Sequence, residues 1–301
     1  MAAHDGDGWT TCAAGHRHWG RYGAAGLLLG DADRVVLQHR APWTHEGDTW
    51  GLPGGARDSH EDAVTGALRE AMEEGGIPAR ACLPVALFVE DHVGWSYTTV
   101  VASLAGEGPA FAPSALNRES TDIRWWTRSE VPALPLHHAL ARHWPVLGQP
   151  VMPLDVIVDA ANVVGARPDG WWRDRVVATQ RLLDALTDLA RVGIAPNQLR
   201  PNAVRAPFDR VLPHITLVVE GAARDINSVT AQGGWPPTVT VLHASSSGDD
   251  TVTATAERSP HALVVTADRG LRDRLSDTTE TAGPGWMWGM LDELSQDPAR
   301  S

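Results

Sequence analysis

The stretch that decides the fold of the first half reads Gly55-Ala-Arg-Asp-Ser-His-Glu61, then seven residues, then Arg69-Glu70-Ala-Met-Glu73-Glu74-Gly-Gly-Ile77. An α-helix advances about 100° per residue, so the glutamates at 70, 73 and 74 share roughly a 100° arc of one helix. Like charges this close repel each other by a few tenths of a kcal/mol per pair, roughly, on an isolated helix. The cluster therefore predicts that a cation binds beside it.

The ends of this helix are also marked in the sequence. Asp58, followed three residues later by Glu61, forms a capping-box pattern and predicts that the helix begins there. The Gly75-Gly76 pair predicts its end. One face is apolar and is expected to pack inward, while the glutamate face is expected to look outward; the apolar positions are Val64, Ala67, Leu68 and Ala71.

This segment resembles the Nudix box, in which Gly, Glu, Arg-Glu, Glu-Glu and Gly recur at fixed spacing, and every fixed position is met. The resemblance implies an α/β/α sandwich that hydrolyses a nucleoside diphosphate linked to another moiety. It also implies Mg²⁺ or Mn²⁺ held by the box glutamates. Oxygen-only ligands suit such a hard cation, which bridges phosphate oxygens and activates water.

The resemblance assigns roles position by position. Glu70, Glu73 and Glu74 would be metal ligands, one of them also a base, and the carbonyl of Gly54 a further ligand. Arg69 would orient Glu73, four residues further on. The remaining box positions are Gly55, Glu61 and Gly76, with Glu61 read as a cap and ion-pair partner.

Glu119 is a further candidate ligand outside the box. It precedes a strand-like segment, residues 123–126, and resembles a loop glutamate that completes the metal site in some family members. A surface acid is the alternative, because loop glutamates are usually solvated.

The chain has 301 residues, which favours about two domains. The Nudix resemblance covers 1–150. Repeated prolines between about His143 and Leu154 predict a stiff linker and a boundary near residue 151. In 151–301, apolar runs alternate with a helical segment at 171–191, which predicts a parallel α/β sheet. The runs are at 154–158, 214–219, 239–242 and 262–266.

Acidic residues follow three of these apolar runs. They are expected at the carboxyl edge of the sheet, where carboxylates can hold divalent ions for phosphodiester hydrolysis. This half resembles the PIN-like NYN ribonuclease domains. An inactive domain is the alternative, because Asp at a helix start is often only an N-cap. The candidate ligands are Asp159, Asp249, Asp250 and Asp268, with Asp155 and Asp273 either joining them or structural.

A basic, tryptophan-containing segment follows the first of these runs. Arginine and tryptophan together suit phosphate contact and base stacking, so the segment is a candidate RNA-binding rim. Residues 167–210 hold eight arginines and five aspartates, a net charge of +3. An exposed turn and an amphipathic helix with ordinary ion pairs are the alternative. The candidate contacts are Asn162, Trp171, Trp172, Arg173 and Arg175.

The composition excludes several classes of function. A net charge of −12 argues against broad nonspecific adhesion to nucleic acid or membranes. All 25 basic residues are arginine, so no mechanism uses a lysine base or Schiff base. The first residues carry neither a basic flank nor an apolar run, and we therefore expect a cytoplasmic protein without a membrane partner.

The two cysteines are Cys12 and Cys82. Cys12 lies near His16 and His18, and thiolate and imidazole are zinc ligands. A structural zinc normally takes four ligands, and no second Cys/His pair at fitting spacing is present, so a turn leading into a strand is the favoured interpretation.

Two functional hypotheses remain for the whole chain. The first is a metal-dependent pyrophosphohydrolase fused to a ribonuclease. The second is a nucleotide-sensing module that regulates an inactive RNA-binding domain. The sequence names neither the nucleotide nor the oligomeric state.

Overall fold

The computed structural model describes residues 4–105, 111–168, 170–199, 208–221, 226, 239–245, 247–259 and 261–296. The described residues form two compact units. The first contains residues up to Met152 together with Phe208 and Asp209, and the second contains the others. In the described ranges, no helix combines the length and the apolar character that crossing a membrane requires.

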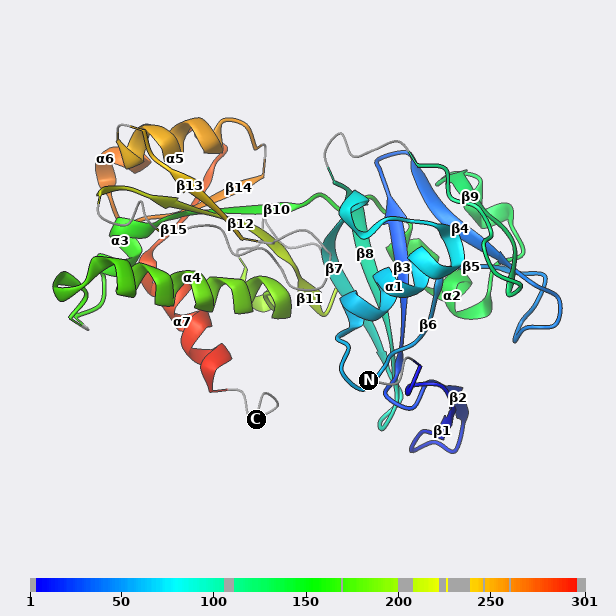
Figure 1. The fold of residues 1–301 in the computed structure, drawn as a ribbon. Coiled ribbons are helices and arrows are strands. Elements are labelled where there is room, and N and C mark those ends of the chain that lie inside the picture. The colour runs from blue at the N-terminus through cyan, green and yellow to red at the C-terminus, as the bar shows by residue number, and fades with distance from the viewer. Residues whose placement is uncertain are drawn as a thin grey trace. The chain divides into compact units, whose positions relative to one another are not determined.

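The first unit is built on a mixed β-sheet (Figure 1). Its central strands lie in the order β7-β8-β3-β4-β5, while β6 pairs with β3 and β9 pairs with β4. A separate hairpin, β1 and β2, precedes the sheet. The strands are β1 (Trp9–Thr11), β2 (Arg17–Trp19), β3 (Ala24–Gly30), β4 (Arg34–Arg40), β5 (Trp50–Gly51), β6 (Gly54–Ala56), β7 (Cys82–Asp91), β8 (Ser96–Leu104) and β9 (Ser120–Thr127).

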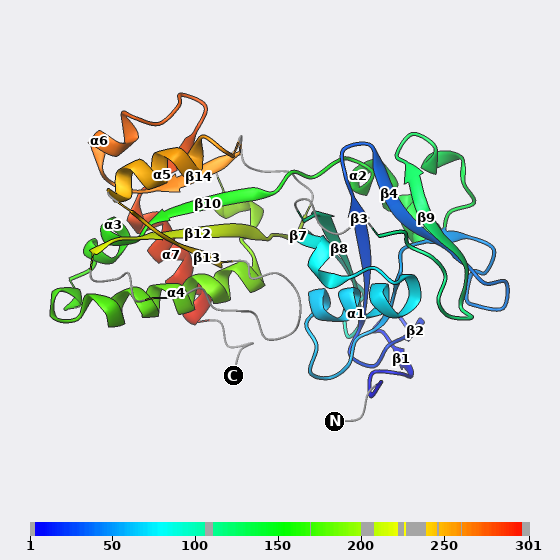
Figure 2. The same ribbon diagram turned by 45° about the horizontal axis from the view of Figure 1, so that its top comes forward.

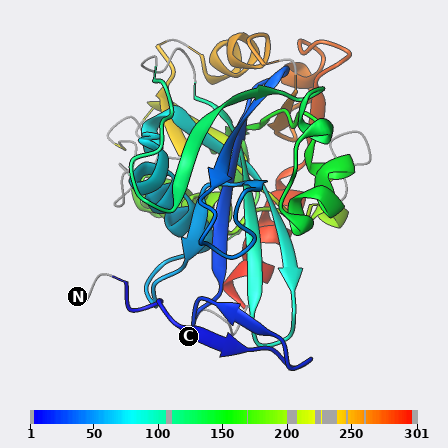
Figure 3. The same cartoon turned by 90° about the vertical axis from the view of Figure 1, so that its right-hand side faces the viewer.

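Helices α1 (Ala63–Gly75) and α2 (His138–Leu147) cover opposite faces of this sheet, as Figure 3 shows. On the α2 face, Leu140 and Trp144 pack with Leu28 and Leu37 in a buried apolar cluster. The arrangement agrees with the expected sandwich of a sheet between helices. Two 3₁₀ turns complete the unit, Ala79–Ala81 and Val131–Ala133.

The expected start of α1 was wrong by four residues. The N-cap is Asp62, whose carboxylate accepts from the amide of Thr65 at 2.8 Å. Asp58 cannot serve there because its carboxylate accepts from the amides of His4 and Gly6. The expected end is confirmed, since Gly76 takes the left-handed conformation at φ 63°.

The expected linker began too early in the chain. Residues up to Leu147 belong to α2, which contains Pro145. Proline normally destabilises a helix interior by roughly 3 kcal/mol. Here Trp144 and Leu147 are buried in the apolar cluster of the α2 face, and this packing offsets that cost.

The second unit contains the predicted parallel sheet, with strand order β13-β12-β10-β14-β15 and parallel pairing between all neighbours (Figure 2). The strands are β10 (Leu154–Asp159), β12 (Pro213–Val219), β13 (Val239–His243), β14 (Ala262–Val265) and β15 (Glu280–Ala282), and a two-residue strand β11 (Arg210–Val211) lies outside this sheet. The last strand, β15, was not foreseen, because a three-residue segment carries too little pattern.

Helices cover both faces of this sheet. One buried cluster joins the sheet to α3, α4 and α7, and a second joins it to α5 and α6. The helices are α3 (Ala160–Gly165), α4 (Arg175–Val192), α5 (Gly248–Ala256), α6 (Arg269–Arg272) and α7 (Pro284–Ser295), with 3₁₀ turns at Trp171–Arg173 and Pro196–Gln198. The predicted helix at 171–191 is thus a 3₁₀ turn followed by an α-helix.

Candidate active site

The glutamates of α1 lie beside a glycine turn in the first unit. Gly54 and Gly55 belong to β6, which pairs with β3. A Cβ atom on Gly55 would lie 2.6 Å from Oε1 of Glu70. A Cβ atom on Gly54 would lie 2.4 Å from the carbonyl oxygen of Ala25. Glycine at 55 therefore lets the Glu70 carboxylate lie against the backbone, and glycine at 54 lets the two strands pair.

The expectation that all three glutamates look outward was wrong. Glu73 is exposed, Glu70 is largely covered, and Glu74 is only 4% exposed. Gln38 Nε2 donates to Glu74 Oε1 at 2.9 Å, and the amide of Gly54 donates to Oε2 at 2.8 Å. The spacing along the helix predicted that the three glutamates lie on one side of it. The spacing could not show that residues of β4 and β6 cover Glu74 on that side.

Arg69 links the box residues to one another. Its guanidinium donates from Nε and Nη2 to the two oxygens of Glu61, at 2.8 and 2.9 Å. Its Nη1 donates to Glu70 at 2.9 Å and to Glu73 at 3.3 Å. Glu61 also accepts from the amide of Asp58, at 3.0 Å. Glu61 is thus a cap and ion-pair partner as expected, while Arg69 holds Glu61 and Glu70 more closely than Glu73.

The carboxylates of this cluster raise one another's pKa. Burial, together with the charges of Glu70 and Glu119, raises the pKa of Glu74 to about 7, against the opposing effect of its two hydrogen bonds. Burial also raises the pKa of Glu70, with Glu73 and Glu119 adding to the effect against the opposing charge of Arg69. Glu119 therefore lies close enough to repel both, although it is exposed.

This donor set fits a hard divalent cation. It supplies carboxylate oxygens from α1 and from the loop before β9, and a cation would relieve their mutual repulsion. Arg69 currently neutralises part of the charge on Glu70 and Glu73. The roles of Gly54 and Glu119 as ligands stay predictions.

Sequence reasoning missed two polar residues that support the site. Gln38 lies in β4 and is 1% exposed; its Nε2 donates to both Glu74 and Ser120 Oγ, the latter at 2.6 Å. Gln38 follows three consecutive apolar residues in the sequence. A lone amide in an apolar strand is a signal for a buried polar contact, because buried polar groups need partners.

The tryptophans near the site differ in environment. Trp50 is buried against Trp126, with ring centroids 5.0 Å apart. Trp95 stacks on His18. Trp43 is 70% exposed and is the one of these that a nucleobase could reach without rearrangement of the core.

In the second unit, acidic residues gather at the carboxyl ends of the strands. Burial raises the pKa of Asp159, and the charges of Asp249 and Glu220 add to the shift. Burial raises the pKa of Asp249 as well, helped by Asp268, Glu220 and Asp250. Glu220, directly after β12, was missed, although its place after an apolar run matches that of Asp159.

Two other acids face elsewhere. Asp250 pairs with Arg274, whose guanidinium also lies 3.9 Å from Asp249. Asp155 lies at the start of β10, where it accepts from Ser259 Oγ and contacts His214 Nδ1 at 3.2 Å. Asp155 is therefore at the opposite end of the strand from Asp159, and its role is structural.

Several residues of this edge serve as helix caps. Asp159 accepts from the amide of Asn162 at 3.1 Å, and Asp268 caps α6. Asn162 Oδ1 accepts from the amide of Ala267 at 2.7 Å, so this side chain braces the edge. Asp273 is the C-cap of α6. Asp159 and Asp268 are therefore both helix N-caps, and each also lies in the acidic cluster at this edge.

The expected RNA-binding residues form an exposed corner before α4. Trp172 is 58% exposed and meets Trp171 edge-on, with ring centroids 6.2 Å apart. Arg175 lies over the Trp171 ring at 5.1 Å, and Arg173 is exposed. Part of the expected basic strip, 200–207, lies outside the described residues.

The first half of the chain is similar to known proteins. The NUDIX domain family matches residues 20–146. The chain is 49% identical over 151 residues to "Putative 8-oxo-dGTP diphosphatase 3" of Mycobacterium tuberculosis, covering 46% of this chain and 68% of the relative. It is 44% identical to a "Nucleoside triphosphate pyrophosphatase/Nudix hydrolase fusion protein" of Bifidobacterium longum, covering 46% of this chain and 30% of the relative.

Among solved structures, the Nudix hydrolase RenU of M. smegmatis is 45% identical. That match covers 46% of this chain and 91% of that one, with a TM-score of 0.43. The chain is a hydrolase that acts on phosphoanhydride bonds. It belongs to the Nudix family through its N-terminal half.

Proposed function

We propose that residues 1–150 form a nucleotide pyrophosphohydrolase domain that uses Mg²⁺ or Mn²⁺, and that its substrates are nucleoside triphosphates, including oxidised purine nucleotides. The observation that carries the metal site is the repulsion among Glu70, Glu74 and Glu119 beside the glycine turn. The substrate class rests on the relative named for 8-oxo-dGTP.

The metal ion would supply charge neutralisation at the phosphates and a more acidic bound water. Glu70, Glu73, Glu74 and Glu119 would hold it, with Gly55 giving Glu70 room against the backbone. Arg69 keeps Glu70 and Glu73 oriented and compensates their charge before substrate arrives. Gln38 fixes the buried carboxylate of Glu74.

The test is a panel of nucleotides with each metal ion. 8-oxo-dGTP, dGTP, the other nucleoside triphosphates, a sugar nucleotide and a dinucleoside polyphosphate are incubated with Mg²⁺ or Mn²⁺, and the products are separated. We expect a nucleoside monophosphate and pyrophosphate from the triphosphates, with 8-oxo-dGTP turned over faster than dGTP. Turnover confined to the sugar nucleotide or the dinucleotide would overturn the substrate assignment.

The aspartate cluster of the second unit supports a second activity. We infer that residues 151–301 form a PIN-like NYN domain that cuts RNA with a divalent cation. Asp159, Asp249, Asp268 and Glu220 would hold the ion, because they repel one another at the carboxyl edge of a parallel sheet. Trp172, Arg173 and Arg175 would contact the RNA.

This second activity is tested with end-labelled single-stranded RNA, Mg²⁺ or Mn²⁺ and the full chain. We expect cleavage that a chelator stops and that Asp159→Asn lowers. RNA binding without cleavage would instead favour the inactive RNA-binding domain. If the chain neither binds nor cleaves RNA, the proposal that this unit acts on RNA is wrong.

A further inference from the structure

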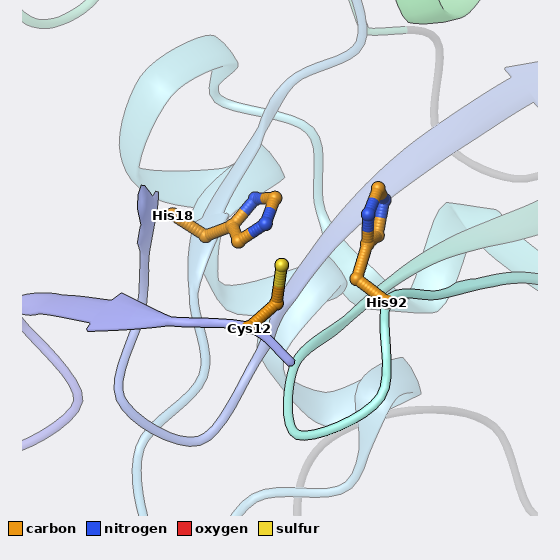
Figure 4. A group of neighbouring side chains, drawn as sticks. All are labelled: Cys12, His18 and His92. Atoms are coloured by element: carbon orange, nitrogen blue, oxygen red, sulfur yellow. The ribbon is translucent and has the colours of Figure 1, made fainter. Parts of the chain in front are cut away.

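Two side chains of the N-terminal hairpin meet a third side chain from a distant part of the first unit, as Figure 4 shows. Cys12, His18 and His92 each offer one ligand atom, and these atoms all lie within 4.8 Å of one another. The sulfur of Cys12 points toward the space between the two imidazole rings. His92 follows Cys12 by 80 residues, which is why neighbouring sequence could not supply this ligand.

The backbone holds the three residues in register. Cys12 directly follows β1, His18 lies in β2, and His92 lies in the turn between β7 and β8. The amide of Cys12 donates to the carbonyl of His16 at 3.0 Å and closes the hairpin. The amide of Ala13 donates to the carbonyl of Val93 at 2.9 Å, which ties the hairpin to the β7–β8 turn.

One ring nitrogen of this group lacks a partner. Nε2 of His18 is buried and, in the described part of the chain, has no hydrogen-bond partner. The His18 ring stacks on Trp95, with centroids 4.1 Å apart and an interplanar angle of 11°. Trp95 is fixed in turn, because its Nε1 donates to the carbonyls of Trp19 and Gly20 at 3.2 and 3.0 Å. The imidazole is thus held in place while one of its nitrogens stays unused.

The thiol of this group is also buried. Cys12 is 4% exposed, so its sulfur is shielded from solvent.

We propose that Cys12, His18 and His92 bind one Zn²⁺ ion through a thiolate and two imidazoles. This mixed sulfur and nitrogen donor set is typical of zinc, in contrast to the oxygen-only set of the glutamates. In a tetrahedral zinc site, ligand atoms lie roughly 3.3–3.6 Å apart, so the ligand atoms of the three side chains would move together by at most about 1.5 Å. Water would take the fourth position, since His16 is exposed and its ring centroid lies 6.5 Å from that of His18.

Two other groups of three side chains also have ligand atoms close together, but their carboxylates already have hydrogen-bond partners. In the group of His45, Glu46 and His137, both Glu46 oxygens already contact the amide or the ring of His138. In the group of Asp5, Asp58 and His60, the Asp58 carboxylate accepts two backbone amides and Asp5 accepts from Ser59. The carboxylate oxygens of these two groups already accept hydrogen bonds from protein donors, whereas Nε2 of His18 has no partner among the described residues.

The ion would cross-link the β1–β2 hairpin to the β7–β8 turn. The segment before the hairpin also braces the turn ahead of α1, because the amides of His4 and Gly6 donate to Asp58. Zinc binding is therefore expected to raise the melting temperature of the first unit, since a ligand that binds only the folded form stabilises it.

The test uses the full chain, freed of metal by a chelator and then titrated with Zn²⁺ in the presence of excess Mg²⁺, which occupies the glutamates. Elemental analysis should find one zinc per chain. Co²⁺ in place of Zn²⁺ should give a thiolate-to-metal charge-transfer band. Cys12→Ser and His92→Asn should each remove the band and weaken zinc binding by more than about 100-fold, given that even outer ligand partners contribute 10–100-fold.

Cys82→Ser is the matched control for the thiol. Cys82 is buried and lies outside the group of Cys12, His18 and His92, and burial raises the pKa of its thiol to about 12. The Cys82→Ser and Glu73→Gln variants should bind zinc like the wild type. His92 lies in an exposed turn, so His92→Asn gives a reading even if Cys12→Ser fails to fold. Absence of zinc binding in excess Mg²⁺, or equal binding by wild type and His92→Asn, would overturn the proposal.

Discussion

The two acidic sites of this chain differ in how the protein positions their carboxylates. In the first unit, three glutamates come from one helix, and a glycine turn and Gln38 hold them from the opposite side. In the second unit, four acids come from the ends of three strands and the start of one helix. A single sequence motif can therefore specify the first site, whereas the second exists only once the sheet has formed.

The two sites also differ in how their charge is balanced. Arg69 contacts Glu61, Glu70 and Glu73 at once. In the second unit, the guanidinium of Arg274 pairs with Asp250 and lies 3.9 Å from the carboxylate of Asp249. Arg69 and its contacts thus organise the glutamates of the first unit without a cation, whereas no arginine contact of this kind organises the clustered acids Asp159, Asp249 and Asp268 among the described residues.

The first prediction concerns the space that glycine at position 55 gives to Glu70. In Gly55→Ala, the new Cβ would lie 2.6 Å from the Glu70 carboxylate and displace it. We expect kcat/KM for nucleotide hydrolysis to fall by about 100-fold, because a displacement near 1 Å has that cost. Gly285→Ala is the control, since its Cβ would meet nothing within 4 Å. Full activity in Gly55→Ala would show that the glycine turn does not position the site.

The next prediction concerns the buried carboxylate of Glu74. Its folded pKa of about 7 lies above the ordinary 4.5, so the metal-free folded protein binds more protons than the unfolded chain between these values. Stability therefore falls as pH rises through this window, by about 3 kcal/mol from this group.

The measurement is urea unfolding of the metal-free wild type and of Glu74→Gln, on both sides of that window. The wild type should lose more stability on going to high pH than the variant, because glutamine does not titrate. An identical pH dependence of the two proteins would show that Glu74 is not held in a protonated state.

A smaller effect is expected at the exposed aromatic corner of the second unit. Trp172→Ala should weaken binding of single-stranded RNA by about tenfold, the usual contribution of one stacked base. Trp43→Ala, which removes an even more exposed tryptophan of the first unit, should leave RNA affinity unchanged. Equal losses in both variants, measured by fluorescence anisotropy, would remove the distinction between the two units in RNA binding.

The smallest expected effect is a difference in stability between substitutions of two aspartates in the same strand, Asp155 and Asp159. Hydrogen bonds from His214 and Ser259 outweigh burial and lower the pKa of Asp155, whereas burial and neighbouring charges raise that of Asp159. Asp155→Asn should therefore cost about 1 kcal/mol of stability, the usual contribution of a lost hydrogen bond. Asp159→Asn should cost none, since asparagine caps a helix as well and carries no charge. Thermal unfolding of both variants near neutral pH checks this, and the reverse order would contradict it.

The sequence was most informative where function depends on local spacing. The box residues at 61, 69, 70, 73 and 74 lie within one helix and its cap, so their grouping followed from helical geometry. It could not show that Glu74 is buried, because the covering residue Gln38 comes from a distant strand. The start of α1 was misplaced for a similar reason, since the carboxylate of Asp58 is used by the N-terminal segment.

In the second unit, the parallel sheet was predictable from continuous apolar runs, and so was the edge at which the acids lie. The sequence could not predict which of the acids lie close together, because Asp155 and Asp159 differ only by their position along β10. The same limit applies to His92, which reaches Cys12 and His18 only through the pairing of β7 with β8.

The existence of two separate acidic sites is tested most directly by measuring nucleotide hydrolysis and RNA cleavage in the same three proteins: wild type, Glu73→Gln and Asp268→Asn. Glu73→Gln should lose nucleotide hydrolysis by about 10²–10⁴-fold, the size of a lost acid-base or ligand contribution, and keep RNA cleavage. Asp268→Asn should show the opposite pattern. Loss of both activities in either variant, or nucleotide hydrolysis unaffected by Glu73→Gln, would contradict two separate acidic sites.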